Sequence, residues 1–192
     1  LPLSAVRPMG LTAAGGAERC RIEFKASCLA TFVDPATGEP RVACGCWENY
    51  RGKVHIYDPV AGGAALVVLD VGSPVYALAV FKDPATGEPR LACGCEDGKV
   101  RIVDPVAGGE ALLVIDGGGQ LAVFKDPATG APRLACGGRI FDPVAGGQAL
   151  LVINVGDPVS ALVVFEDPAT GASRLACGGY KLCVFDPGAG GE

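Results

Sequence analysis

The sequence predicts an all-β protein made of four repeated units, each forming a small antiparallel sheet. One phrase occurs four times, in Phe32–Gly45, Phe81–Gly94, Phe124–Gly137 and Phe165–Gly178. A shorter phrase, Asp-Pro-X-Ala-Gly-Gly, follows each copy. No segment of helical length is free of Gly and Pro while showing a 3.6-residue period. One such unit cannot bury its own apolar face, so we expect neighbouring units to stack and build the core.

The second unit shows its strands most fully. The alternating segment Pro74–Phe81 predicts a first strand, and the turn formers of Asp83–Pro89 predict a hairpin loop after it. Asp97-Gly98 predicts a tight turn between the second and third strands. The expected strands cover residues 74–81, 90–96, 99–103 and 110–116.

The units differ in length. The third is shortened at Leu134–Asp142, whereas the first is extended over Cys44–Asp58. Such changes fall where loops are expected, as repeat folds tolerate. We expect an N-terminal extension over residues 1–12 and a repeat domain over residues 13–192. Its four units span about 28–69, 74–116, 119–153 and 158–186, the last completed by residues 17–24.

The two ends of the repeat region are complementary. Ala13–Phe24 aligns with the fourth-strand segment of a unit, whereas the last unit ends after a third strand at Lys181–Phe185. We expect the N-terminal strand to pair into the last unit and close a ring, because closure protects the sheet edges. The sequence therefore predicts a four-bladed β-propeller.

The unit Gly72–Asp116 resembles a WD40 repeat, and the resemblance extends over roughly residues 13–191. It implies a propeller scaffold that binds partners across one face of the ring. The Trp-Asp that usually ends the third strand is missing in every unit, and so is the Gly-His before the first strand. Without the family's hydrogen-bond network we expect a softer ring. The residues that replace Trp-Asp are Tyr57-Asp58, Val103-Asp104, Phe141-Asp142 and Phe185-Asp186.

Charge and hydropathy argue against two classes of partner. The net charge is −5 and the pI is about 4.9, whereas nucleic acid and anionic membranes bind basic surfaces. No apolar run approaches the roughly 18 residues of a membrane helix. We therefore expect protein or peptide partners, with neither nucleic acid nor membrane. A homodimer that shares a strand stays open.

Nine cysteines invite a disulfide or metal interpretation. Cys44, Cys93, Cys136 and Cys177 hold one position in every repeat, which favours equivalent packing slots in the core. Buried free thiols in turn predict a reducing, cytoplasmic location. The Cys44/Cys46 and Cys93/Cys95 pairs belong to separate units and are a weak metal signal. We expect no metal and no cofactor.

Catalytic patterns are also missing. The single histidine, His55, has no nucleophile at a defined elbow, and no common catalytic motif is present. The recurring aspartates at the start of each loop are interpreted as turn formers that accept backbone hydrogen bonds. We therefore expect a protein that is not an enzyme. A propeller-type hydrolase, or a fragment of a larger propeller without independent function, is the alternative.

The expected binding surface is the end of the units where the second and third strands are joined. The first unit has an enlarged hairpin there, containing the only tryptophan of the chain, Trp47. Trp, Tyr and Arg contribute most to interface energies. The alternative is that Trp47 folds back over an apolar rim. The candidate protein-binding residues are Trp47, Glu48, Tyr50, Arg51, Glu96, Asp97, Arg139, Tyr180 and Lys181.

Overall fold

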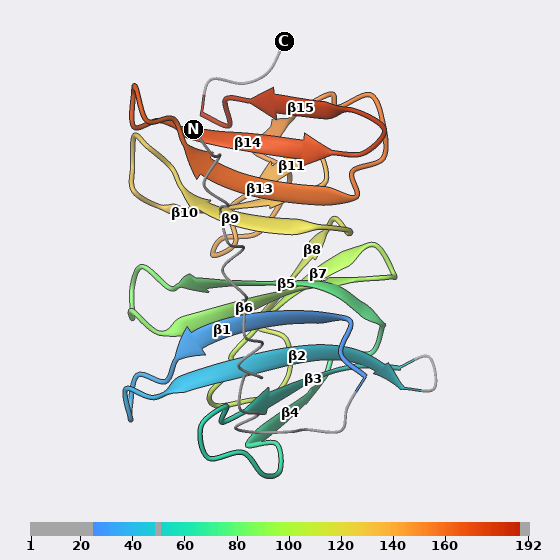
Figure 1. Cartoon of the computed structure of the whole chain (residues 1–192), viewed down its shortest axis with the longest axis vertical. Helices are drawn as coiled ribbons and strands as arrows, with labels where there is room; N and C mark the ends of the chain where they lie inside the picture. The colour runs from blue at the N-terminus through green and yellow to red at the C-terminus, as the bar shows by residue number, and fades with distance from the viewer. Residues whose placement is uncertain (1–24, 49–50, 189–192) are drawn as a thin grey trace, which may run out of the picture.

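The computed structural model describes residues 25–48 and 51–188, and all regular elements there are β-strands (Figure 1). They form four antiparallel sheets, which we call blades 1 to 4 in chain order. Within each blade the strands follow one another as in the sequence, so every blade is a meander. Blades 1 to 3 have four strands each, and the described part of blade 4 has three. The predicted fold class is confirmed.

The strands are short, as the density of turn residues predicts. Blade 1 contains β1 (Cys28–Val33), β2 (Pro40–Glu48), β3 (Arg51–Tyr57) and β4 (Val67–Asp70). Blade 2 contains β5 (Val75–Lys82), β6 (Pro89–Cys95), β7 (Lys99–Val103) and β8 (Leu113–Asp116). Blade 3 contains β9 (Leu121–Lys125), β10 (Pro132–Cys136), β11 (Arg139–Phe141) and β12 (Leu151–Val152). Blade 4 contains β13 (Ala161–Glu166), β14 (Ser173–Gly178) and β15 (Leu182–Phe185).

The fourth strand of blade 2 is shorter than predicted. It begins at Leu113 instead of residue 110, because Gly108 and Gly109 adopt φ of 74° and 93° and direct the chain away from the sheet. The chain reaches β7 only at Leu112, whose N–H donates to the carbonyl of Ile102. The predicted ring closure depends on residues 17–24, which lie outside the described residues.

Successive blades pack face to face. The first strands β1, β5, β9 and β13 contact one another in that order (Figure 1). Three apolar clusters lie between blades 1 and 2, blades 2 and 3, and blades 3 and 4. Among residues 25–48 and 51–188, no such cluster joins blade 4 to blade 1. The core of the chain is thus a series of inter-blade layers.

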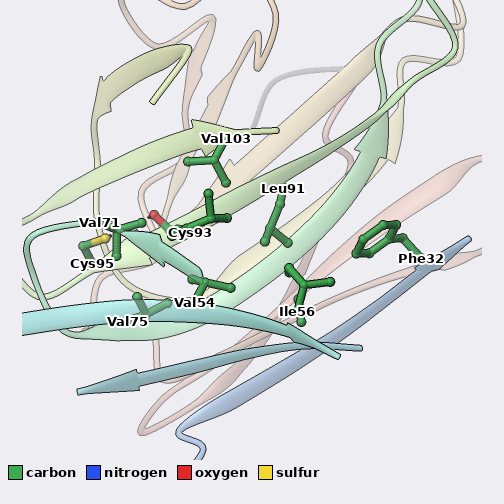
Figure 2. Close-up of a cluster of buried hydrophobic side chains, with 11 residues drawn as sticks. Phe32, Val54, Ile56, Val71, Val75, Leu91, Cys93, Cys95 and Val103 are labelled. Carbon is green, nitrogen blue, oxygen red and sulfur yellow. Dashed lines mark hydrogen bonds between the residues drawn. The ribbon is translucent and has the colours of Figure 1, made fainter. Parts of the chain in front are cut away.

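The layer between blades 1 and 2 shows how the repeat builds the core. Ile56 of β3 and Leu91 of β6 project toward each other across the layer (Figure 2). Both are almost completely buried, as is Val54 beside Ile56. β-Branched and aliphatic side chains on alternating positions fill this space, which explains the strand pattern of the sequence.

Three of the four recurring cysteines, Cys93, Cys136 and Cys177, lie in these layers. Cys44, Cys93, Cys136 and Cys177 are buried, and none of them forms a disulfide. Burial raises the pKa of the Cys136 thiol to about 11 and also raises the pKa of Cys93. These thiols are therefore protonated at neutral pH and are poor nucleophiles. The prediction that the recurring cysteines pack as small apolar groups is confirmed for Cys93, Cys136 and Cys177.

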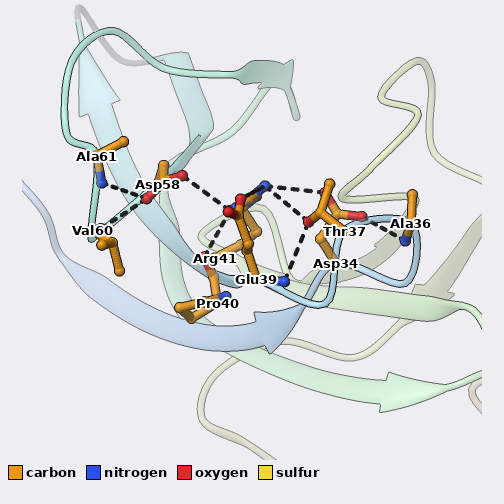
Figure 3. A network of polar contacts seen from close by, with 9 residues as sticks. All are labelled: Asp34, Ala36, Thr37, Glu39, Pro40, Arg41, Asp58, Val60 and Ala61. Carbon is orange, nitrogen blue, oxygen red and sulfur yellow. Dashed lines mark hydrogen bonds and ion pairs between the residues drawn. The ribbon is translucent and has the colours of Figure 1, made fainter.

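The recurring loop aspartates form their predicted turns and do more. Asp34 Oδ1 accepts the N–H of Ala36 at 2.9 Å, and Asp58 Oδ1 accepts the N–H of Val60 at 2.8 Å (Figure 3). Their other carboxylate oxygens both bind Arg41, at 3.3 and 3.2 Å. One guanidinium therefore joins the two loops at this end of blade 1.

This arginine clamp occurs in all four blades. A softer ring in the absence of the WD40 network stays a prediction, but each blade has this polar network of its own. Because Arg offers a planar fork of donors, it can bind two carboxylates at once. The clamps are Arg41 with Asp34 and Asp58, Arg90 with Asp83 and Asp104, Arg133 with Asp126 and Asp142, and Arg174 with Asp167 and Asp186.

The clamps predict a loss of stability in acid. Backbone N–H donors, from Ala36 to Asp34 and from Ala61 to Asp58, lower the pKa of both carboxyl groups below the usual value. A carboxyl group whose pKa is lower in the folded state stabilises the fold at pH values above its unfolded pKa, near 3.9. That stabilisation is lost as the pH falls through the folded-state pKa. We expect the melting temperature, measured by circular dichroism, to fall below about pH 4.

A matched variant separates the clamps from general acid effects. Asp34→Asn keeps an oxygen acceptor for Ala36 N–H but removes the titrating group. We expect its melting temperature to fall less steeply with acid than that of the wild type. Identical slopes would contradict a contribution from this carboxylate.

Candidate functional site

The β2–β3 hairpin extends beyond its counterparts in the other blades. In blade 2 the ladder between second and third strands ends at Gly94 and Val100, whereas in blade 1 it continues three pairs beyond the equivalent Gly45 and Val54. The last of these pairs joins Glu48 to Arg51. The hairpin therefore projects from the end of the blades that lies to the right in Figure 1.

Trp47 lies on this projection and is 45% exposed. The Lys25 ammonium lies 5.2 Å from the centroid of the indole ring, a cation–π geometry. Instead of being sealed into an apolar rim, the indole keeps much of its surface in solvent. Arg51, at the start of β3, is also exposed. Of the other candidates here, Glu48 ends β2 and Tyr50 lies outside the described residues.

The matching hairpin of blade 2 is held by its own contacts. Both guanidinium nitrogens of Arg101 bind the Asp97 carboxylate, at 3.1 and 2.6 Å, and the resulting hydrogen bonds lower the pKa of Asp97. The N–H of Asp97 donates to the hydroxyl of Ser73 at 3.1 Å. A hydrogen bond to Glu96 raises the pKa of Tyr76. The charged side chains Asp97 and Arg101 already bind each other here, so they are less available to a partner.

The remaining candidates lie at the same end, on blades 3 and 4. Arg139 borders a shallow hollow of about 510 Å³ formed with the connection over residues 152–159. Tyr180 is 88% exposed, and Lys181 beside it is exposed too. Within the described residues, none of the candidate side chains bonds to the hairpin of another blade. The structure thus gathers the candidates on one end without joining them into a pocket.

A cleft at the opposite end of the blades was not predicted from the sequence. It has a volume of about 520 Å³ and lies between blades 2 and 3, where β5 and β9 end. Phe81 and Phe124 form its apolar wall, and Lys82 and Lys125 border it. The sequence does contain a signal for it, because Lys follows the repeated Phe only in the second and third repeats. The cleft is thus an apolar hollow bordered by two lysines.

The described residues offer little for redox or metal chemistry. No group of three or more His, Cys, Asp or Glu side chains among residues 25–48 and 51–188 is arranged to hold a metal ion. His55 stacks on Tyr57, with ring centroids 6.1 Å apart, which is a packing role. The same residues contain no helix that is long and apolar enough to cross a membrane.

Comparison with models of protein families finds no match. Comparison with curated proteins finds no match either. In structure the chain is similar to BBS1N, solved in complex with ARL6DN, with TM-scores of 0.55 and 0.60 in two crystal structures and 16% identity in both. These similarities cover 82% and 84% of this chain and 50% and 51% of BBS1N. The V. cholerae biofilm matrix protein Bap1 is also similar, with TM-score 0.56, 13% identity, and coverage of 78% and 27%.

These similarities, together with four antiparallel meanders packed face to face, decide the fold class. The chain folds as a β-propeller. It spans about half the length of BBS1N, the first of these propellers. At such low sequence identity the likeness concerns the fold, so function must be argued from the surfaces of this chain.

Proposed function

We propose that this chain is a WD40-like β-propeller that acts as a non-enzymatic scaffold or adaptor, binding proteins or peptides through the hairpin end of its blades. The observation that carries the proposal is the projecting β2–β3 hairpin with its exposed Trp47. Aromatic and arginine side chains on a rigid projection are typical of interface hot spots. The crystal structure of BBS1N in complex with ARL6DN supports a binding role for a propeller of this fold.

The proposed layout follows the repeats. The propeller covers residues 13–192 after an N-terminal extension over residues 1–12. We expect residues 17–24 to complete blade 4, either of the same chain or, in a homodimer that shares a strand, of the second copy. The buried free thiols support a cytoplasmic, reducing location. The acidic net charge supports partners other than nucleic acid or membrane.

A competing hydrolase function would need convergent titratable groups around the axis. The hairpin carboxylate of Asp97 is instead paired with Arg101. Binding is therefore the function that these surfaces support best. A specific, saturable partner would also distinguish the chain from a propeller fragment without an independent role.

Affinity capture with two matched double variants tests the site. The immobilised 192-residue chain is exposed to lysate of its source cell, and bound proteins are quantified by mass spectrometry. We expect Trp47→Ala/Arg51→Ala to reduce recovery of the specific partner about tenfold or more, because hot-spot residues dominate affinity. Lys82→Glu/Lys125→Glu, which reverses the charge at the opposite cleft, is expected to leave recovery unchanged.

Both variants change exposed side chains, so circular dichroism should match the wild type. If the hairpin variant retained the partner and the cleft variant lost it, the binding site would lie at the cleft. Recovery unaffected by both would contradict binding at either end of the blades.

A further inference from the structure

The side of each blade that faces the next blade has a constant pattern, and we call it the trailing face. In blades 1 to 3 it carries Phe on the first strand, Ala on the second and Ile on the third, at most 7% exposed. The register defines these positions, because the Phe always pairs with the clamp arginine and the Ile with the Ala. The trailing-face residues are Phe32, Ala43 and Ile56, then Phe81, Ala92 and Ile102, then Phe124, Ala135 and Ile140.

Blade 4 keeps this face, but among residues 25–48 and 51–188 no other blade covers it. Phe165 pairs with Arg174, and Val184 pairs with Ala176, so they occupy the same positions. Phe165 is 42% exposed and Val184 is 53% exposed, whereas Phe81 is 5% exposed. Val163 and Leu182 on the same face are also exposed. A row of apolar side chains that is core in three blades is therefore open to solvent in the fourth.

The chain also has an exposed position on the surface that would fit against this face. We call the opposite side of each blade the leading face. On its first strand this face carries a Leu that pairs with the repeated Cys. In blades 2 to 4 this residue is Leu78, Leu121 and Leu162, and each packs against the preceding blade. Leu29 holds this position in blade 1, paired with Cys44, and is 61% exposed.

We propose that a second copy of this chain covers the trailing face of blade 4 with the leading face of its blade 1. The contact would repeat the packing of Phe and Ile against Leu that joins the blades within one chain. Two copies make two such contacts, and head-to-tail contacts form a closed ring when the rotation returns to the start. Eight blades lie within the range of known propellers.

The electrostatics of the face permit its burial. Arg174 lies on the trailing face and binds Asp186 at 2.8 Å and Asp167 at 3.4 Å. Covering the face therefore buries a guanidinium that already has two carboxylate partners. An unpaired charge in this place would oppose association.

Sedimentation equilibrium of the 192-residue chain tests the proposal. We expect the mass of two copies for the wild type and of one copy for either Val184→Asp or Leu29→Asp, with unchanged circular dichroism. Val114→Asp, at an exposed position of β8, should remain dimeric. Mixing the Val184→Asp and Leu29→Asp chains should restore a two-copy species, because the mixture keeps one intact contact.

The mixing result is specific for the head-to-tail contact. A dimer formed by two trailing faces would survive Leu29→Asp, and mixing would leave the Val184→Asp chain monomeric. A monomeric wild type would overturn the proposal. If β13 in that monomer were protected from hydrogen exchange, and deleting residues 1–24 removed the protection, the face would belong to the N-terminal segment. Assemblies larger than two copies would overturn the eight-blade ring. This test is independent of partner capture at the hairpin end.

Discussion

Replacing Leu91 with alanine is expected to lower the free energy of unfolding by about 2–5 kcal/mol. Leu91 lies in the layer between blades 1 and 2 and has no exposed surface. Because it faces Ile56 across the layer, its truncation leaves a cavity that two rigid sheets cannot easily close (Figure 2). Urea unfolding followed by circular dichroism measures the loss.

Leu112 provides the matched control. It has the same side chain, but it lies outside the strands and is 58% exposed. Leu112→Ala should change the free energy of unfolding by less than about 0.5 kcal/mol, as is typical of surface positions. Equal losses for Leu91→Ala and Leu112→Ala would contradict the inter-blade layer as the source of stability.

The repeat predicted the architecture because it records contacts that recur. Each copy has the same alternating strand and the same buried Cys position, so the slots occupied by Cys93 and Cys136 could be predicted without coordinates. Turn chemistry was equally local, since Asp34 accepts a hydrogen bond from a residue two positions away. Local patterns and periodicity therefore carry most of the fold.

Other features depend on register and could not be predicted in the same way. Arg41 joins loops that are distant in sequence, and only the pairing of β2 with β1 and β3 brings Asp34 and Asp58 to it. The cleft beside Lys82 exists only because two blades meet there. The exposed Phe165 carries the same sequence signal as the buried Phe81, so the repeat alone cannot tell which faces are covered.

Glycines in the hairpins illustrate the same limit and lead to the second large effect. The sequence suggests that they serve as turn formers, yet a Cβ added to Gly52 would collide with the backbone carbonyl of Ser73 in the connection to blade 2. Gly179 in blade 4 would collide in the same way with the carbonyl of Pro158. At these two positions glycine thus allows the connection between blades to pass directly against the hairpin.

Gly52→Ala is therefore expected to destabilise the chain by about 3 kcal/mol, because a backbone carbonyl cannot move aside as a flexible side chain does. Displacing Ser73 would also disturb its hydrogen bond from Asp97 and the bond from Val71 N–H to Gly52. Gly178→Ala is the control, since a Cβ there would meet Ala161 at an ordinary 3.6 Å. Its stability should stay within about 1 kcal/mol of the wild type. Equal tolerance of both substitutions in urea unfolding would show that the connection has room to shift, and close backbone contact would then not explain the glycine at this position.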